Sequence, residues 1–259
     1  MAGAQVKVSA LTADTTPTGD DLILTVNDPA GTPGTKRTTV TQLGTYLSSQ
    51  LSLNSGWTPV TDSWAYALAD AITIPSDGTT VYQKGVKIRF KQGAGYKYYT
   101  ASAVAATLLT VLVNSDYTVA NAAITDVAYS YAESPFGWPV YFNFVPTLTG
   151  FSADPTTTVY RYKPSSGSMR IDIRQTANGT SNATTFTMTL PATAATVTNM
   201  VWISADASVV DNSAGVTTPG AIFVSSAGTV MNIYTNQQAA GWTSSGGKRL
   251  AIGNITYEW

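Results

Sequence analysis

The clearest regular pattern in the chain is an alternation of apolar and basic side chains over residues 86–91. The run is Val86-Lys87-Ile88-Arg89-Phe90-Lys91, and a period of two is typical of a strand with one buried face. Gly93-Ala94-Gly95 follows as a turn, and Tyr96 begins a run that returns toward Tyr99. The pattern predicts a β-hairpin at this point of the chain.

Short strands are predicted on both sides of this hairpin, because apolar and aromatic runs are separated by turn residues. The strongest runs cover residues 108–113, 127–131, 158–162, 169–174 and 185–190. We therefore expect a mainly β protein, with a middle β-barrel or sandwich module over 57–142 and a jelly-roll-like β-sandwich over 156–259. Residues 143–155 contain Pro146, Gly150 and Pro155 and are predicted to link these two domains.

One helix is predicted, over about residues 39–51. Thr39 and Gln42 have the spacing of a capping box, which marks a helix start. The apolar residues that follow fall on one helical face; they are Val40, Leu43, Leu47 and Leu51. Residues 1–56 are too few to bury a core of their own. We expect this N-terminal segment to pack against another protein or against the rest of the chain.

Composition narrows the function classes. Hydrophobic residues make up 44% of the 259 residues and charged residues only 11%, so Thr, Ser, Asn, Gln and Gly must cover the surface, which suits broad protein contacts. The net charge of −1 argues against a nucleic-acid partner. No run approaches the roughly 18 apolar residues of a membrane span, and the start lacks an apolar core of signal-peptide length. We expect a protein made in a cytoplasm, without membrane insertion.

The first fifth of the chain is similar to a known class of proteins. Three of its runs, Lys7-Val8-Ser9-Ala10-Leu11-Thr12, Gly19-Asp20-Asp21-Leu22-Ile23-Leu24 and Thr35-Lys36-Arg37-Thr38-Thr39-Val40-Thr41-Gln42-Leu43, resemble the N-terminal segment of bacteriophage tail-fibre and virion-appendage proteins. In that family the segment attaches the appendage to the particle. The residues that the resemblance assigns to attachment are Leu11, Leu22, Leu24, Val40, Leu43 and Leu47.

Two further stretches resemble the same class. Trp57, the run Lys87-Ile88-Arg89-Phe90-Lys91-Gln92-Gly93 and residues 114–118 and 129–139 resemble a module of phage appendage proteins. Residues 242–248 and 255–259 resemble the end of phage fibre head domains. The resemblance implies a structural component of a virion, made in the host bacterial cytoplasm, whose C-terminal β-domain contacts a host-surface glycan or protein. Its partners would be capsid, portal or neck, or tail proteins. One alternative is a capsid decoration protein without a receptor.

Self-association is a further expectation. The apolar stripe of the predicted helix is close to the spacing of a coiled-coil seam, and one helix of about three turns is marginal alone in water. Parallel copies around an axis would bury the stripe, and the resemblance implies threefold symmetry. We therefore expect a homotrimer. The alternative is a monomer whose helix packs on its own middle module.

The candidate ligand contacts are basic residues of the hairpin together with one tryptophan. Lys87, Arg89, Lys91 and Lys97 are gathered there, and they fit acidic glycans or phosphates. The alternative is a solvated strand face whose lysines block edge-to-edge pairing. Trp242, beside Gly241 and a Ser-Ser-Gly-Gly loop, is the tryptophan expected to be exposed for stacking on a sugar.

No catalytic residue, metal site or cofactor is expected. Histidine and cysteine are absent, which removes the commonest general base and thiolate ligands. A capsule-degrading enzyme would need paired carboxyl groups, and the only two glutamates are Glu133 and Glu258. Asp206, Asp211 and Asn212 offer oxygen ligands for Ca²⁺, but without EF-hand spacing a loop role is favoured.

Overall fold

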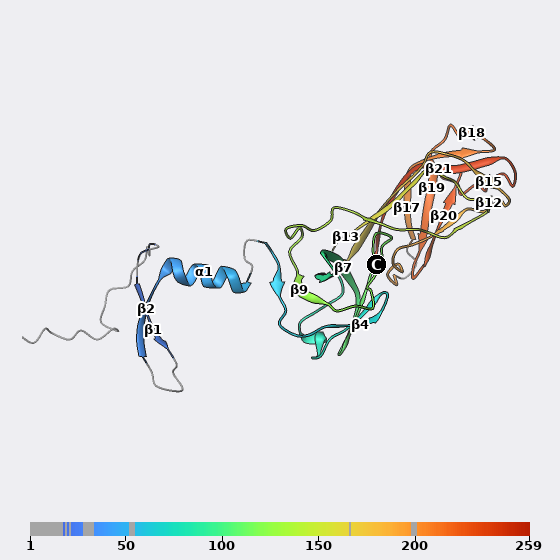
Figure 1. The fold of residues 1–259 in the computed structure, drawn as a ribbon. Helices are drawn as coiled ribbons and strands as arrows, with labels where there is room; N and C mark the ends of the chain where they lie inside the picture. The colour runs from blue at the N-terminus through green and yellow to red at the C-terminus, as the bar shows by residue number, and fades with distance from the viewer. Residues whose placement is uncertain are drawn as a thin grey trace, which may run out of the picture. The chain divides into compact units, whose positions relative to one another are not determined.

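The computed structural model describes residues 18, 20, 22–27, 34–51, 55–165, 167–197 and 201–259 (Figure 1). The chain divides into two compact units, Met1–Thr58 and Pro59–Trp259. The fold is mainly β, with several antiparallel sheets of which one curls into a half-barrel, and the predicted fold class is confirmed. Whether the second unit acts as two domains, as the sequence predicts, stays a prediction.

The N-terminal unit contains one hairpin and one helix. Strands β1 (Leu22–Asn27) and β2 (Gly34–Thr39) pair antiparallel, and helix α1 (Val40–Leu51) follows directly. The Gln42 backbone N–H donates to Thr39 Oγ1 at 3.0 Å, and the Thr39 N–H donates to Gln42 Oε1 at 3.0 Å. These reciprocal bonds satisfy backbone donors at the helix start, so the predicted capping box is confirmed.

A seven-stranded antiparallel sheet forms the first part of the second unit. Its strand order is β3-β9-β6-β7-β8-β5-β4, and a short 3-10 helix, η2 (Gly78–Thr80), follows β5. The strands are β3 (Thr58–Pro59), β4 (Ala65–Leu68), β5 (Ala71–Thr73), β6 (Lys87–Gln92), β7 (Gly95–Ala105), β8 (Leu108–Val111) and β9 (Thr125–Ser130). Ile88 and Phe90 of β6 are fully buried, and the Phe90 ring stacks on Tyr99 of β7 with centroids 5.3 Å apart. The apolar face of the predicted alternation therefore builds this core.

The predicted hairpin is confirmed as β6 and β7. Gln92 lies opposite Gly95, so the loop between the strands consists of Gly93 and Ala94 alone. Gly93 has a φ of +71°, and glycine in the first of two loop positions is what a type II′ turn requires. Because β9 pairs with the other edge of β6, the hairpin's first strand is internal to the sheet.

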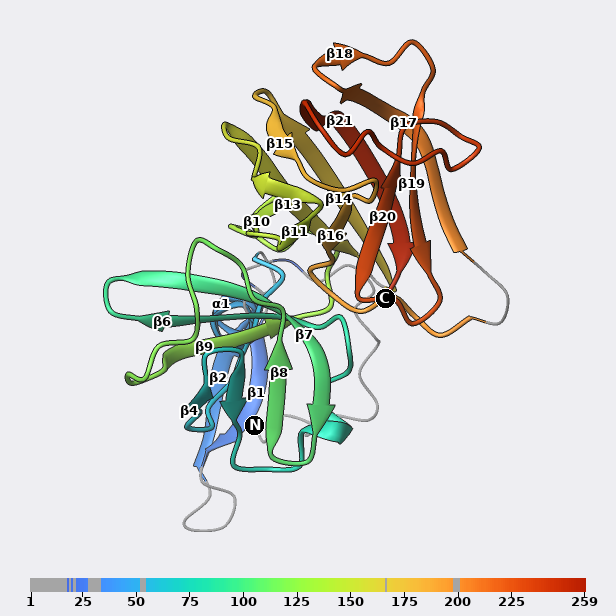
Figure 2. The same ribbon diagram turned by 90° about the vertical axis from the view of Figure 1, so that its right-hand side faces the viewer.

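A twelve-stranded antiparallel sheet system forms the rest of the second unit (Figure 2). Its main path is β10-β13-β14-β21-β17-β19-β20-β16-β11, with β12, β15 and β18 paired off that path. The strands are β10 (Phe142–Asn143), β11 (Leu148–Thr149), β12 (Phe151–Ala153), β13 (Thr158–Ser165), β14 (Ser168–Gln175), β15 (Gly179–Ser181), β16 (Thr187–Thr189), β17 (Val201–Asp211), β18 (Ala214–Gly215), β19 (Gly220–Ser225), β20 (Val230–Tyr234) and β21 (Gly247–Glu258).

Strand β14 shows how the sequence specifies one face of this sheet. Met169, Ile171 and Ile173 are buried in the core, whereas Arg170 and Arg174 are exposed on the other face. A period of two separates the faces because successive side chains of a strand point to opposite sides. The outer face of β14 is therefore polar and carries two arginines.

Residues 143–155 differ from the predicted linker. They contain β11, β12 and the last residue of β10, and each of these strands pairs with another strand of the large sheet system. Gly150 has a φ of +93°, and a Cβ there would lie 2.0 Å from the Thr185 carbonyl oxygen. This glycine serves a close backbone approach, so the segment belongs to the sheet.

Candidate functional site

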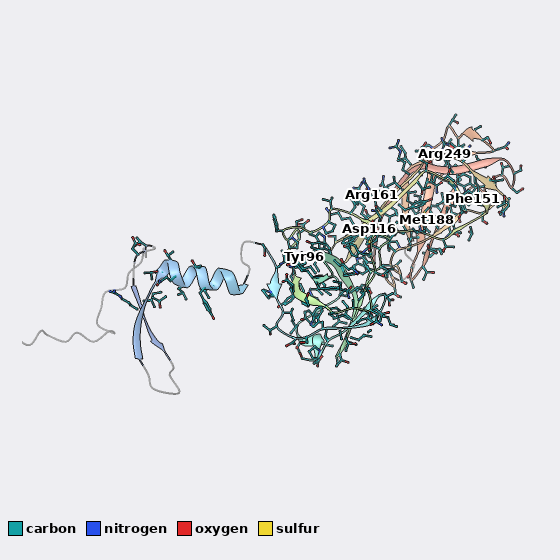
Figure 3. All side chains as sticks on the ribbon, in the orientation of Figure 1. Tyr96, Asp116, Phe151, Arg161, Met188 and Arg249 are labelled. Atoms are coloured by element: carbon teal, nitrogen blue, oxygen red, sulfur yellow. The ribbon has the colours of Figure 1, made fainter. Side chains whose placement is uncertain are left out.

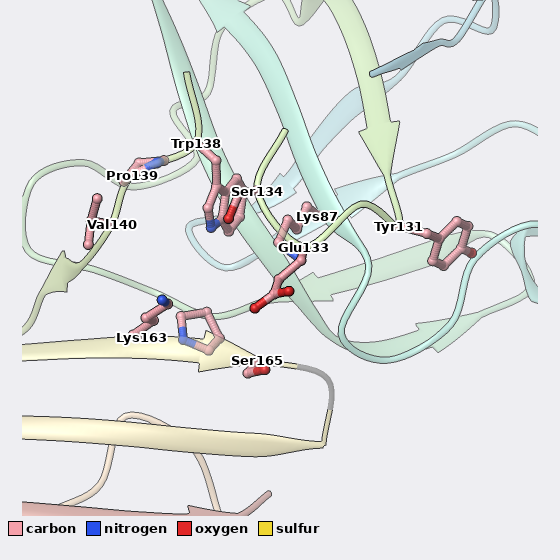
Figure 4. Close-up of a pocket in the computed structure, with 10 residues that line it drawn as sticks. Lys87, Tyr131, Glu133, Ser134, Trp138, Pro139, Val140, Lys163 and Ser165 are labelled. Carbon is pink, nitrogen blue, oxygen red and sulfur yellow. The ribbon is translucent and has the colours of Figure 1, made fainter. Parts of the chain in front are cut away.

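A pocket of about 470 Å³ lies within the second unit, beside the start of β6 (Figure 4). One wall comes from Lys87 and the loop that follows β9. The opposite wall comes from the end of β13, where Figure 4 shows Lys163 and Ser165. The lining residues are Lys87, Tyr131, Glu133, Ser134, Trp138, Pro139, Val140, Lys163, Pro164 and Ser165. Its volume is within the range of small-molecule sites.

Lys87 enters the pocket from the interior of the sheet. It lies opposite Thr100 on β7 and Ser130 on β9, and its residue is only 9% exposed. Its Nζ lies over the Trp138 ring, 5.5 Å from the centroid, a cation–π contact that fixes the ammonium group. Burial lowers the pKa of Lys87, and the negative charge of Glu133 acts in the opposite direction.

The loop after β9 is held by its own contacts. The Tyr131 hydroxyl donates to the Val81 carbonyl oxygen, and the Trp138 N–H donates to the Pro135 carbonyl oxygen at 3.0 Å. The Trp138 ring packs edge-on against Tyr98 and Phe142 at centroid distances of 6.1 and 5.2 Å. These contacts hold the Trp138 ring in one orientation, and the ring forms part of this wall of the pocket.

Lys163 lies near the end of β13, beyond the residues that pair with β10. Strand β10 pairs with β13 only at Tyr162 and Arg161, so the edge of β13 from Lys163 onward has no partner from β10. Proline lacks the N–H that would donate a hydrogen bond to a neighbouring strand. Pro164 lies at this edge without a β10 partner, so no such bond to β10 is lost. On its other side β13 pairs with β14, where Lys163 lies directly opposite Arg170.

Of the four basic residues singled out in the hairpin, Lys87 lines this pocket and the others do not. Lys97 Nζ donates to the Thr118 carbonyl oxygen at 2.7 Å. Arg89 and Lys91 lie over the Tyr96 ring at 4.8 and 4.7 Å (Figure 3 labels Tyr96). These three cations therefore have contacts of their own outside the pocket lining.

Lys91 also pairs with an aspartate that a β-bulge presents. Asp126 has a φ of +52° and lies where the β6–β9 register shifts by one residue. Its carboxylate accepts the Tyr96 hydroxyl and lies 2.8 Å from Lys91 Nζ. The hydrogen bond to Lys91 lowers the pKa of Asp126. A bulge commonly redirects a side chain in this way.

The expectation that Trp242 is exposed is wrong. Its side chain is 3% exposed, its ring packs against Phe186, and its Nε1 donates to the Ile233 carbonyl oxygen at 2.6 Å. Gly241 and the serine-rich loop beside it resemble a surface segment, but the loop folds the ring into the core of the large sheet. Trp242 is therefore unavailable for a ligand.

The residues assigned to attachment are described unevenly. Leu11 lies outside the described residues, and for Leu22 and Leu24 the structure describes the strand but not the side chains. On α1, Val40 is half-buried, and the side chains of Leu43 and Leu47 are 37% and 41% exposed.

Of the oxygen ligands considered for Ca²⁺, Asp206 lies outside the side chains that the structure describes. Asp211 accepts the Thr243 backbone N–H and side-chain hydroxyl, at 3.1 and 2.9 Å from its nearest carboxylate oxygens. Within the described ranges no group of three or more carboxylates comes together as metal ligands would. Asp211 therefore links the end of β17 to the segment that carries Thr243.

The pocket includes residues that sequence reasoning missed, namely Glu133, Trp138 and Lys163. Comparison of the chain with family models, curated proteins and solved structures gives no match. Among the described residues, no helix has the length and apolar character needed to cross a membrane.

Proposed function

We propose that the chain is a structural component of a bacteriophage virion, a fibre or appendage attached through its N-terminal segment. The proposal is supported by the resemblance of three stretches to appendage proteins and by the separation of a small N-terminal unit from a large β unit. The observation that carries it is the apolar surface of α1. Leu43, Tyr46 and Leu47 are 37%, 61% and 41% exposed, so this helix leaves apolar area for a partner.

The partner that the spacing favours first is a second and third copy of the same helix. Leu43 and Leu47 are four residues apart and Val40 is three residues before Leu43, which is the spacing of a coiled-coil seam. In a trimer the three helices bury this stripe at the axis, and the surrounding N-terminal units dock on capsid, neck or tail proteins. The β unit is then held away from the particle for contact with the host surface.

Exchange of one seam residue tests the trimer. Leu47→Asp places three carboxylates together at the axis, which costs several kcal/mol if they are buried and unpaired. Thr45→Asp is the matched control, because Thr45 lies on the opposite face of α1 and its side chain donates within the helix, to the Thr41 carbonyl oxygen at 2.9 Å. Sedimentation should give three times 27.2 kDa for the parent chain and for Thr45→Asp, and a lower mass for Leu47→Asp. A parent mass of one chain refutes the trimer.

Removal of the N-terminal segment tests attachment. A chain lacking residues 1–47 should remain folded by β-sheet circular dichroism, because both sheets of the second unit are intact. It should no longer join particles that are assembled in its presence. Normal incorporation of the truncated chain would refute attachment through this segment. Electron microscopy of labelled particles then separates an appendage, seen at few positions, from a decoration protein, seen over the capsid.

A further inference from the structure

Among the described residues, the charged side chains that line the pocket form no ion pair within 4.0 Å. The pocket holds the ammonium groups of Lys87 and Lys163 and the carboxylate of Glu133. The three ion pairs among the described residues involve other side chains. The pocket therefore carries a net charge of about +1 near neutral pH.

The position of Lys163 in β13 is electrostatically unfavourable. It lies directly opposite Arg170, and like charges directly opposite one another destabilise an antiparallel pair. Arg170 has its own counter-charge, because its Nε lies 2.9 Å from Asp172 Oδ1. Asp172 is further engaged by Arg161 at 3.4 Å. The nearby carboxylate is therefore shared by the two arginines, and an anion in the pocket would relieve the repulsion that Lys163 meets.

Lys87 strengthens the case because its ammonium group is already partly removed from water. The residue is 9% exposed and held against Trp138. A charge in such surroundings interacts more strongly with an incoming anion than a fully hydrated lysine does. The cation–π contact also fixes its position before binding, which reduces the ordering cost.

The remaining lining fits a ring that has both apolar and hydroxylated faces. Pro139, Pro164 and Trp138 supply rigid apolar surface, while Ser134 and Ser165 supply hydroxyl groups. Glu133 can only accept hydrogen bonds when ionised, and it repels a second negative charge. A mixture of rigid apolar surface and a few convergent polar groups is typical of small-ligand sites.

We propose that this pocket binds a sugar unit that carries a single carboxylate, such as a uronic acid within an acidic polysaccharide. The carboxylate lies between the ammonium groups of Lys87 and Lys163, and Glu133 accepts hydrogen bonds from sugar hydroxyls. This inference deepens the proposed function, since it rests on the chain contacting a host surface and names the chemistry of that contact. It places the contact at the boundary between the two sheets.

The test is calorimetric titration of the full 259-residue chain with an oligomer of galacturonic acid. The matched ligands are the neutral galactose oligomer and galactose 6-phosphate. The acidic oligomer should bind and the neutral one should not. Its affinity should fall as the salt concentration rises from about 0.05 to 0.5 M, because salt screens the lysine–carboxylate attraction.

Three variants locate the binding. Lys163→Gln should weaken the acidic oligomer about tenfold, the loss expected for a charge-assisted hydrogen bond. Arg174→Gln is the control, because it removes another exposed cation from the same sheet outside the pocket, and it should change the affinity less than about twofold. Glu133→Gln should raise the affinity for the sugar phosphate, because it removes the group that excludes a doubly charged ligand.

Each other outcome overturns the inference. Equal binding of the neutral oligomer would make the lysines irrelevant, and preferential binding of the sugar phosphate by the parent chain would exclude a carboxylate ligand. Absence of binding by the parent chain would refute the site itself. These results are independent of particle assembly, so a failure of the attachment experiment leaves the pocket standing, and a failure here leaves attachment standing.

Discussion

The buried lysine of the large sheet makes a quantitative prediction about stability and pH. Lys248 is fully buried, and its Nζ donates to the carbonyl oxygens of Ala183 and Thr185 at 3.0 and 2.8 Å. It also lies over the Phe151 ring at 4.8 Å. Burial lowers the pKa of Lys248 to about 8 from 10.5, against a smaller effect of Asp211 in the opposite direction. The lysine therefore loses its proton in the folded chain before it does so in the unfolded chain.

The sign of the effect follows from the protons bound in each state. Between pH 8 and pH 10.5 the unfolded chain keeps the proton of Lys248 and the folded chain has released it, so the free energy of unfolding rises with pH. The whole interval corresponds to about 3 kcal/mol at about 1.4 kcal/mol per pKa unit. The aromatic faces attract the ammonium form and oppose the shift, so this figure is the upper end.

Urea denaturation at a series of pH values from 7 to 10 measures this slope. The informative quantity is the difference in the free energy of unfolding between the parent chain and Lys248→Met, which cannot titrate at this position. Lys163→Met is the control, because it removes an exposed lysine from the same unit. The parent should gain stability relative to Lys248→Met as the pH rises, and its difference from Lys163→Met should stay flat. A flat or falling difference with Lys248→Met would refute the assigned pKa.

Two further predictions concern the tyrosines and the glycines. Burial raises the pKa of Tyr82 and Tyr117 to about 12, and it also raises the pKa values of Tyr99, Tyr162 and Tyr257. Above pH 10 the unfolded chain therefore loses protons that these five side chains keep in the folded chain, so the free energy of unfolding should fall there. The tyrosinate absorbance of these five side chains should appear only as the protein unfolds. Ionisation of all tyrosines near pH 10 in a folded chain would contradict this. Gly150→Ala should destabilise the chain more than Gly93→Ala in urea denaturation, because both positions have a positive φ but a Cβ at residue 150 would also lie 2.0 Å from the Thr185 carbonyl oxygen. Gly93 has open space around it, so Gly93→Ala should cost about 1–2 kcal/mol for the backbone conformation alone. Equal losses would show that the Thr185 carbonyl does not restrict residue 150.

Local sequence patterns predicted those helices and strands whose position depends on interactions between residues close together in the sequence. The Thr39 and Gln42 pair fixes the helix start through bonds within four residues, and the alternation at Ile88 and Phe90 identifies a strand with a core face. The same alternation did not reveal that Lys87 is buried. Its Nζ lies against Trp138 of the loop after β9, and no local spacing in the sequence relates these two residues.

The candidate pocket was less accessible to sequence reasoning for the same physical cause. Lys163 belongs to a strand that meets the hairpin region only through the tertiary fold, so no local spacing relates it to Lys87. Trp242 shows the opposite error, since Gly and Ser neighbours indicate exposure but the Ile233 carbonyl oxygen satisfies its indole N–H inside the core. Residues 143–155 show a similar error. Their Pro and Gly residues indicate a linker, but they lie between short strands that pair within the sheet.

The position of β21 has a consequence for how the large sheet forms. This strand lies between β14 and β17, although it follows both of them in the sequence. Until β21 is in place, β14 and β17 each present an open strand edge. The pairing of β14 with β21 requires contacts between residues about 80 positions apart in the sequence, such as Arg174 and Ile252. In newly made chains at high concentration, the open edges of β14 and β17 can therefore pair with the β21 of a neighbouring copy as well as with their own. Slow folding and strand exchange between copies are the expected hazards of this topology, and dilution during refolding should suppress the exchange.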